Sequence, residues 1–424
     1  MKHVILGAGP AGVIAAETLR KNAPHDEVVL IGDEPEAPYS RMAIPYLLIG
    51  HIDESGTHLR HAPNHFQQRG ITLQRGRAVR LDAAAKTVTL DDGAVVGFDR
   101  LLIATGSSPA SPPVPGIAGP GVHACWTLAD ARAIMSLARP GARVVQMGAG
   151  FIGCIIMEAL ATRGVKLSVV EMGDRMVPRM MGPTAGGMIK AWCQAKQVDV
   201  HTSARVDAIE RDATPVMKVR LSTGAVLEAD LVISATGVKP NIGFLEHSGV
   251  RCLVGVLTDE HLQTNVPGIY AAGDCAEAFD KVSGKTIVSA IQPNAAEQAR
   301  VAALNMIGKV TELPGVTQIN VLDTLGLISA SFGLWDGVPG GQHVELTDKA
   351  AGRHLSLQFD GDKLIGCNSI GWTEHVGVMR GLVEGQVSLG EWKDKLLHDP
   401  TLLMEAYLAR AQAQAEHAHV KPRG

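Results

Sequence analysis

The apolar and polar positions of this chain change twice from a strand-like run to a helical pattern, and the two changes look alike. In the first, the apolar run Val4–Leu6 leads through a glycine-rich turn into a helical pattern over 11–21, and a second apolar run follows at 28–31. The same order returns over 143–170. Short apolar strands that alternate with helices are typical of a parallel sheet with helices on its faces. The pattern therefore predicts an α/β protein with two such units.

Each of the two turns carries the fingerprint G-x-G-x-x-G between its strand and its helix. The first glycine makes the bend, the second lets the backbone approach a pyrophosphate, and the third packs the helix on the strand. Unpaired N–H groups at the helix N-terminus then bind the phosphates. The expected binding residues are Gly7, Gly9, Pro10, Ala11 and Gly12 in the first turn and Gly148, Gly150, Phe151, Ile152 and Gly153 in the second. Two such turns predict two Rossmann-like domains, two bound dinucleotides and electron transfer between them.

An acidic residue stands at the end of the second strand of each unit, where a carboxylate can accept hydrogen bonds from ribose hydroxyls. Asp33 and Glu34 hold this place in the first unit, and Glu171 holds it in the second. The carboxylate of Glu171 suits a 2′-hydroxyl and repels a 2′-phosphate, so we expect NADH to be preferred over NADPH. Arg175 lies nearby in the sequence and could offset part of that repulsion.

Two further strands end in the same small-residue turn. After a turn-like stretch at 93–99, the run 100–103 predicts a buried strand that ends in Ala104, Thr105 and Gly106. The predicted strand 231–234 ends in a similar turn that contains Gly237. The two halves of the chain therefore resemble each other beyond their fingerprints.

Four prolines between 109 and 115 exclude a helix or a central strand, so we expect the chain to cross between domains there. Farther on, 269–271 predicts a strand that ends at Gly273 and Asp274, and a helical pattern containing Ala295 runs from 293 to about 306. From 318, alternating and apolar segments predict a small sheet domain.

The end of the chain has its own pattern. Residues 388 to about 415 are helical in pattern, with a break near Asp399 and Pro400.

The composition narrows the classes of function. Of the 424 residues, 46% are hydrophobic and 19% are charged, which is typical of a folded enzyme, and this length predicts about three domains. Aromatic residues make up only 4% and the net charge is -4, which argues against a nucleic-acid partner. No apolar stretch approaches the length of a membrane span, and a first strand at Val4 leaves no room for a signal peptide, so we expect a cytoplasmic location.

Cysteines and histidines give weaker signals. The six cysteines include no C-x-x-C pair, so we expect free thiols, with Cys154 and Cys275 as packing residues and a redox role for either as the alternative. His58, His61 and His65 have helical spacing, but Pro63 interrupts that helix. Surface histidines are the favoured interpretation there and a metal site the alternative, so no metal is predicted.

Taken together, the motifs resemble the FAD- and NAD(P)-dependent pyridine nucleotide-disulfide oxidoreductase family over nearly the whole chain. They comprise the two fingerprints, the two Ala-Thr-Gly turns and Ala272-Gly273-Asp274-Cys275, of which the last is the most specific. The resemblance implies that the first fingerprint binds FAD and the second binds the nicotinamide nucleotide. It also implies that Asp274 lies against the ribityl and phosphate region of FAD, and that the helix at Ala295 lies beside the flavin ring.

Two branches of that family are similar to this chain. Gly32–Pro35 and Pro38–Arg41 are similar to the rubredoxin, ferredoxin and nitrite reductase flavoproteins, which adds Arg41 to the expected cofactor-binding residues. Residues 42–46 are similar to the Cys-Ala-Leu-Pro-Tyr motif of coenzyme A disulfide reductases and NADH oxidases.

Two residues depart from the family pattern. Met42 stands where the second branch has its redox cysteine, and a thioether cannot form a thiolate. Ile155 stands where the family usually has a glutamate near the flavin and nicotinamide. No catalytic residue is assigned with certainty, and Met42, Pro45 and Ile155 are candidates for positions near the flavin.

The resemblance implies four segments along the chain. An FAD-binding domain would comprise 1–115 and 246–316, with an NAD-binding domain over 116–245 and a C-terminal α/β domain, expected to form a homodimer interface, over 317–424. Hydride would pass from NADH to the flavin, and electrons would pass directly to an acceptor. That acceptor would be a small rubredoxin- or ferredoxin-like protein or a small molecule.

Three alternatives remain open. The chain could pass electrons to oxygen as an NADH oxidase, or it could act as a coenzyme A disulfide or persulfide reductase through another cysteine. It could also be an NADH-sensing flavoprotein that resembles apoptosis-inducing factor and changes its partners when NADH binds.

Overall fold

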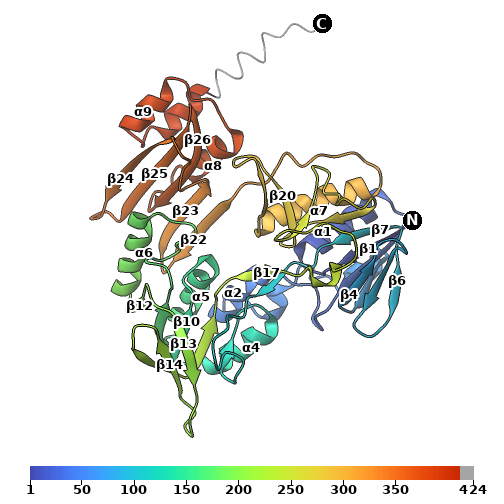
Figure 1. The fold of residues 1–424 in the computed structure, drawn as a ribbon, viewed down its shortest axis with the longest axis horizontal. Helices are drawn as coiled ribbons and strands as arrows, with labels where there is room; N and C mark the ends of the chain where they lie inside the picture. Colours follow the sequence, from blue (N-terminus) through green and yellow to red (C-terminus); the bar gives the residue numbers. More distant parts are fainter. Residues whose placement is uncertain (411–424) are drawn as a thin grey trace. The chain divides into compact units, whose positions relative to one another are not determined.

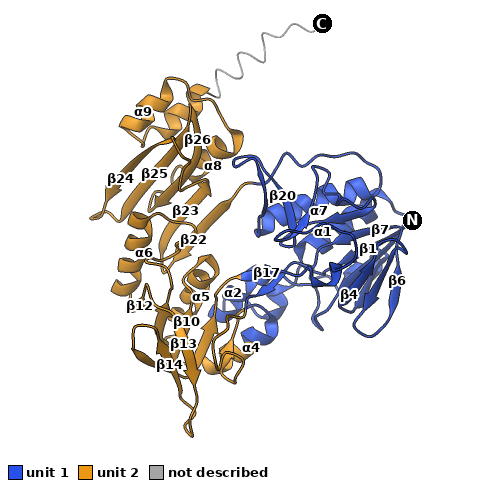
Figure 2. Ribbon diagram, viewed as in Figure 1, with its two compact units in different colours: residues 1–110, 126–131, 238–316 blue, residues 111–125, 132–237, 317–424 orange. Residues whose placement is uncertain are grey.

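The computed structural model describes residues 1–410 of the chain. They divide into two compact units, each assembled from separate segments (Figure 2). The first unit contains 1–110, 126–131 and 238–316, so the chain first leaves it within the proline-rich stretch. The second unit contains 111–125, 132–237 and the residues from 317 onward. Because this division keeps the C-terminal segment together with 132–237, the four-segment domain scheme stays a prediction.

The first unit is built on a five-stranded parallel sheet in the order β19-β7-β1-β2-β3 (Figure 1). Its strands are β1 Lys2–Leu6, β2 Glu27–Gly32, β3 Ile71–Arg75, β7 Arg100–Ile103 and β19 Ile269–Ala271. The strands predicted at β1, β2, β7 and β19 are confirmed, and β3 is a strand that was not predicted. Because β1 lies between β2 and β7, its carboxyl end is at the centre of the sheet, and the first fingerprint begins there.

Two helices pack together on one face of this sheet. They are α1 Pro10–Asn22, which follows the fingerprint, and α7 Gln292–Met306 from the distant segment. Alternate residues of β1 belong to different cores: Ile5 packs with the two helices, whereas Val4 and Leu6 pack on the opposite face. Burial of both faces explains why the strands of this sheet are continuous apolar runs.

Smaller elements complete the first unit. One is the antiparallel sheet of β4 Ala78–Asp82, β5 Thr87–Leu90 and β6 Val95–Gly97, and another is the sheet of β18 Val256–Leu257, β20 Ala276–Asp280 and β21 Lys285–Val288. The strands β8 Ser107–Pro109 and β17 Val238–Pro240 form a pair. The short helices are α2 Ile44–Ile49 and α3 His65–Gln68. The expected turn over 93–99 is wrong in its middle, because β6 pairs with β5 there. Val96 is buried and Val95 is exposed, but a strand of three residues is too short to show alternation in the sequence.

The second unit repeats the plan of the first around its own parallel sheet, in the order β12-β11-β10-β16-β9. Its strands are β9 Val122–His123, β10 Arg143–Met147, β11 Lys166–Val170, β12 Asp199–His201 and β16 Leu231–Ser234, and its helices include α5 Phe151–Thr162 and α6 Pro183–Ala195. Helix α4 Leu128–Leu137 begins in the segment assigned to the first unit. The second fingerprint follows the central strand β10, as the first follows β1.

Two antiparallel sheets belong to the second unit. The smaller consists of β13 Val206–Glu210, β14 Met217–Leu221 and β15 Val226–Ala229; the larger has the order β22-β23-β26-β25-β24 and consists of β22 Ile319–Thr324, β23 Leu327–Gly333, β24 Gln342–Asp348, β25 Arg353–Asp360 and β26 Lys363–Ile370. Helix α8 Val376–Gly385 packs on β23 and β26 (Figure 1). The sheet predicted after residue 318 is confirmed.

The helical pattern predicted over 388–415 is partly wrong. Helix α9 Trp392–His398 begins four residues late, because Ser388 donates a hydrogen bond to Asp362 and Gly390 adopts a left-handed φ of +56°. The break predicted near Asp399 is confirmed, and a further helical segment runs over 403–410. Residues 411–415 lie outside the described part of the chain. Among helices within 1–410, none is long and apolar enough to cross a membrane.

Candidate functional site

The first fingerprint forms the turn between β1 and α1. Gly7 has φ +110°, and a Cβ there would lie 2.0 Å from the carbonyl oxygen of Ala104. A Cβ on Gly12 would lie 1.8 Å from the oxygen of Gly7. At Gly9, the N-cap of α1, a Cβ would meet nothing within 4 Å. The outer glycines therefore permit close packing, and the middle one leaves free space beside the helix N-terminus, which is the geometry that a diphosphate needs.

Distant segments meet this turn. A Cβ on Gly273, which has φ +81°, would lie 3.3 Å from the Cβ of Ala11 and 3.6 Å from that of Ala295. Ser107 donates a hydrogen bond of 3.1 Å from Oγ to Oδ2 of Asp274. The structure thus brings the first fingerprint, the Ala-Thr-Gly turn at 104–106, Gly273 with Asp274 and the start of α7 to one end of the sheet. Their role in binding FAD stays a prediction.

Hydrogen bonds also fix the Ala-Thr-Gly turn at 104–106 within this site. Thr105 and Asn241 exchange two hydrogen bonds, from Thr105 Oγ1 to the Asn241 carbonyl at 2.8 Å and from Asn241 Nδ2 to the Thr105 carbonyl at 2.9 Å. Burial raises the pKa of Asp274, and the hydrogen bond from Ser107 and the charge of Arg41 oppose that rise. The carboxyl group therefore sits in a desolvated place where hydrogen-bond donors matter.

A network of four side chains lies at the end of β2. Arg41 donates from Nη2 to Glu34 at 2.6 Å and from Nη1 to the Trp126 carbonyl and the Tyr39 hydroxyl, both at 2.8 Å. The Tyr39 hydroxyl in turn donates to Glu34 at 2.5 Å, and the guanidinium lies 5.5 Å from the ring centres of Tyr39 and Trp126. Glu34 is therefore committed to this network, whereas Asp33 is exposed and is the acidic residue better placed for a ribose.

The second fingerprint has the same geometry. Gly148 has φ +93°, and a Cβ there would lie 2.4 Å from the carbonyl oxygen of Ala235, the first residue of the second Ala-Thr-Gly turn. A Cβ on Gly153 would lie 2.5 Å from the oxygen of Gly148, and one on Gly150 would again meet nothing within 4 Å. Helix α5 begins at Phe151 and continues through Ile152, so its first N–H groups border this free space. Gly237, with φ +113°, ends the supporting turn.

Glu171 and Arg175 lie in the loop after β11. The carboxylate of Glu171 accepts hydrogen bonds from the backbone N–H of Ala149, inside the fingerprint, and of Gly173, both at 2.7 Å. The guanidinium of Arg175 donates to the carbonyls of Met181 and Pro178 and to the side chain of Asp174. Glu171 therefore contacts the dinucleotide turn, and its predicted contact with a ribose stays a prediction, whereas Arg175 is engaged in contacts within its own loop.

The candidates for positions near the flavin are not gathered within one unit. Met42, which is 50% exposed, lies in the first unit in a short 3-10 helix just before α2, and Pro45 lies in the first turn of α2. Ile155 lies in the second unit on α5 and is partly buried. Their closeness to a bound flavin stays a prediction.

Within residues 1–410 the six cysteines form no disulfide, and all but Cys252 are buried. Burial raises the pKa of Cys154 and of Cys275, and it raises the pKa of Cys193 to about 12. These three thiols are therefore protonated at neutral pH, which agrees with packing roles and not with nucleophilic ones.

The predicted surface histidines are only partly found. His61 is exposed, but the His65 side chain is 12% exposed and its Nε2 lies 2.7 Å from Glu17, which also binds Arg60. The expectation of a surface position is therefore wrong for His65. The contact with Glu17 was not predicted because the two residues are distant in the sequence. Within residues 1–410, no group of three or more His, Cys, Asp or Glu could hold a metal ion.

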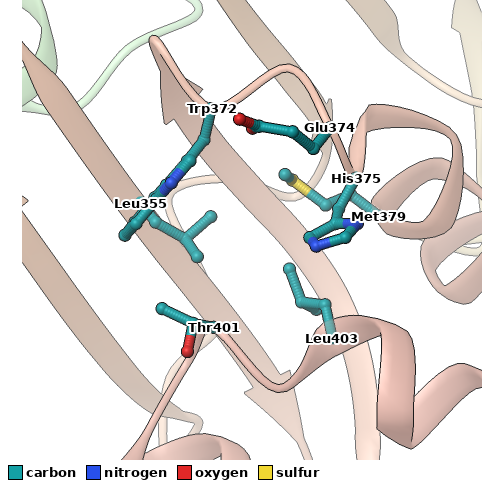
Figure 3. Close-up of a pocket in the computed structure, with 7 residues that line it drawn as sticks. All are labelled: Leu355, Trp372, Glu374, His375, Met379, Thr401 and Leu403. Atoms are coloured by element: carbon teal, nitrogen blue, oxygen red, sulfur yellow. The ribbon is translucent and has the colours of Figure 1, made fainter.

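A separate pocket of about 280 Å³ lies in the second unit (Figure 3). It is lined by Leu355, Trp372, Glu374, His375, Met379, Thr401 and Leu403. These residues come from β25, from the loop that leads to α8, from α8 itself and from the segment after α9, so the pocket contains no residue of either fingerprint.

Several residues that support the site were not predicted. They are Ser107 beside Asp274, Tyr39 and Trp126 around Arg41, Gln298, whose Oε1 accepts the N–H of Gly273 at 2.7 Å, and Gln146 beneath the second fingerprint. Two signals were available in the sequence: Ser107 directly follows an Ala-Thr-Gly turn, and Gln146 interrupts an apolar strand.

Comparisons with known proteins agree with this geometry. Residues 1–302 match the family described as pyridine nucleotide-disulphide oxidoreductase. The epsilon subunit of the NADH-dependent phenylglyoxylate dehydrogenase of Aromatoleum evansii is 30% identical over 403 residues, covering 94% of this chain and 95% of that protein. Rhodocoxin reductase of Rhodococcus erythropolis is 33% identical over 319 residues, covering 74% of each protein. Among solved structures, an NAD-dependent persulfide reductase from A. fulgidus has a TM-score of 0.85 at 26% identity, covering 92% of this chain and 78% of that one.

Proposed function

The chain belongs to the pyridine nucleotide-disulphide oxidoreductase family, and from that premise we propose that it is an FAD-dependent NADH:acceptor oxidoreductase. The first unit binds FAD and the second binds NADH. The observation that carries this assignment is the paired geometry of the two fingerprints. Each has a first glycine against an alanine carbonyl, a third glycine against the first, and free space at the second glycine before a helix N-terminus.

In the first unit the residues bind and orient FAD. The N–H groups at the start of α1 bind the diphosphate, and Asp33 accepts hydrogen bonds from the adenosine ribose. Asp274, which is held by Ser107, accepts a hydrogen bond from a hydroxyl of the ribityl chain. The start of α7, at Ala295, borders the flavin. Arg41 is fixed by Glu34 and Tyr39 and supplies positive charge at the same end of the sheet.

In the second unit the residues bind NADH. The first N–H groups of α5 bind its diphosphate, and Glu171 accepts hydrogen bonds from the 2′-hydroxyl while it stays bonded to the N–H of Ala149. When bound there, FAD would supply the chemistry of hydride acceptance from NADH and of electron donation to an acceptor. That half-reaction requires stacking and orientation of the two rings and no general base.

The residue at the usual redox-cysteine position bears on the acceptor. Met42 is exposed there and cannot carry a thiolate, and the buried thiols of Cys154 and Cys275 are protonated. Electrons therefore leave the flavin directly. The similarity to rhodocoxin reductase supports a small redox protein as the acceptor.

A second candidate rests on the relative that matches over nearly its full length. That protein is named as a subunit of an NADH-dependent dehydrogenase, so this chain would exchange electrons with another subunit of a larger enzyme. A homodimer and a cytoplasmic location remain predictions, and light scattering of the purified protein tests the first.

The acceptor assay separates these candidates. Purified protein is mixed anaerobically with NADH and with a ferredoxin or a rubredoxin, and reduction of the acceptor is followed by its own absorbance. Fast reduction of one acceptor supports the proposal. Fast NADH oxidation with oxygen alone favours the oxidase alternative. Co-purification with a second subunit that accepts electrons favours the complex.

A further inference from the structure

A buried glutamine lies in the strand that leads into the second fingerprint. Gln146 is the fourth residue of β10, two positions before Gly148, and its exposed fraction is 0%. In the first unit the equivalent residue, two positions before Gly7, is Ile5, which is also fully buried and packs in an apolar core. The two sites therefore differ at one core position beneath otherwise similar turns.

The amide of Gln146 joins the two ends of the fingerprint. Its Nε2 donates to the carbonyl of Gly148 at 2.9 Å and to the carbonyl of Gly153 at 3.0 Å. Because both partners are acceptors, the amide nitrogen must face them, which fixes the orientation of the side chain. One group therefore bridges the bend of the turn and the first turn of α5.

The bridged turn is more open than its counterpart. A Cβ on the third glycine would lie 1.8 Å from the first glycine's oxygen in the first fingerprint and 2.5 Å from it in the second. The same Cβ on Gly153 would lie 3.0 Å from Gln146 Nε2, so the amide occupies the space beside the contact of Gly148 with Gly153. The amide thus sets the spacing between the bend and the helix.

Stability alone does not account for a glutamine here. The two hydrogen bonds of Nε2 favour folding, but Gln146 Oε1 is buried and has no donor among residues 1–410. An unpaired buried carbonyl offsets much of what such bonds contribute, and an aliphatic side chain such as Ile5 has no such cost.

We propose that Gln146 is a positioning residue for NADH: by tying the carbonyls of Gly148 and Gly153 together, it aims the first N–H groups of α5 at the dinucleotide diphosphate. This inference rests on the proposed function of the second unit. It concerns the spacing of the cradle and adds no contact between Gln146 and NADH.

The test compares Gln146→Met, which keeps the side-chain length and removes the amide, with Val145→Ala. Val145 is 1% exposed on the neighbouring position of β10, and its side chain packs in the core on the side of β13–β15, so its truncation weakens the unit without touching the fingerprint carbonyls. Gln146→Ile, which copies the first unit, is the second variant if the methionine form does not fold. For each protein, anaerobic stopped-flow reduction of the flavin at increasing NADH gives the Kd for NADH and the limiting rate, and FAD per chain and the Tm are measured in parallel.

We expect Gln146→Met to keep one FAD per chain and to raise the Kd for NADH about tenfold, with a smaller change in the limiting rate. Val145→Ala should lower the Tm and leave the Kd unchanged. The inference is overturned if Gln146→Met binds NADH like the wild type, or if Val145→Ala raises the Kd as much as Gln146→Met does. Failure of the wild type to saturate with NADH would instead refute the proposed function of the second unit.

Discussion

Discrimination between NADH and NADPH follows from the placement of Glu171 and Arg175. The Glu171 carboxylate is held beside the fingerprint by the N–H groups of Ala149 and Gly173, so it cannot swing away from a 2′-phosphate without losing two hydrogen bonds. Arg175 is the nearby cation that could offset this repulsion, but its guanidinium donates hydrogen bonds to Met181, Pro178 and Asp174. Arg175 is therefore not available to neutralise the repulsion between Glu171 and a 2′-phosphate.

The size of the effect follows from the Coulomb repulsion between the Glu171 carboxylate and a 2′-phosphate at contact distance. Two like unit charges about 4 Å apart repel by about 4 kcal/mol at an effective dielectric constant of about 20. With a screening length of about 8 Å at physiological salt, about 2.5 kcal/mol remains. At about 1.4 kcal/mol per factor of ten, NADPH should bind roughly 50- to 100-fold more weakly than NADH.

Glu171→Gln removes the charge and keeps one acceptor oxygen, so the preference for NADH should fall to less than about tenfold. Glu210→Gln, on the antiparallel sheet of the same unit and half exposed, removes an equal charge away from the fingerprint and should leave the preference unchanged. The assay is the Kd of each nucleotide from anaerobic flavin reduction. Equal Kd values for NADH and NADPH in the wild type, or an unchanged ratio in Glu171→Gln, would refute the reasoning.

Three further predictions concern the first unit. Gly9→Ala apoprotein should have the Tm of the wild-type apoprotein, because the added Cβ meets nothing within 4 Å, yet the variant should bind little FAD, because that Cβ fills the diphosphate space. Flavin per chain measures this, and full flavin content would count against the site. With Met42 in place of a redox cysteine, anaerobic dithionite titration should consume two electrons per FAD with no thiolate charge-transfer band, and uptake of four would restore disulfide chemistry. Burial raises the pKa of Asp274 in the folded protein above its value in the unfolded chain. As the pH rises above the ordinary carboxyl pKa, the unfolded chain releases the carboxyl proton before the folded protein does, so the apoprotein loses stability. Asp274→Asn should therefore raise the Tm of the apoprotein at pH 7 and weaken FAD binding, and a lower apoprotein Tm would contradict this.

The sequence predicted the two dinucleotide units well because their signals are local. The strand before Gly7, the helix after it and the strand that ends at Asp33 each depend on neighbouring residues, and the same holds for the second unit. The free space at Gly9 and Gly150 follows from the same short motif.

What escaped prediction depends on contacts that the hydrophobic pattern and the motifs do not reveal. Glu34 and Asp33 look equivalent in the sequence, and only the arrival of Arg41 and Trp126 separates their roles. His65 has the spacing of a surface histidine, but Glu17 on α1 captures it. The bridge made by Gln146 depends on the path of the turn back over its own strand, which no periodicity reveals.

The central claim is that FAD in the first unit is reduced by NADH bound in the second. Anaerobic stopped-flow mixing of the purified yellow protein with NADH tests it most directly, because the flavin absorbance reports the transfer without any acceptor. We expect rapid bleaching of the oxidised flavin band, with a rate that saturates as the NADH concentration is raised. A flavin that dithionite reduces but NADH leaves oxidised would contradict it.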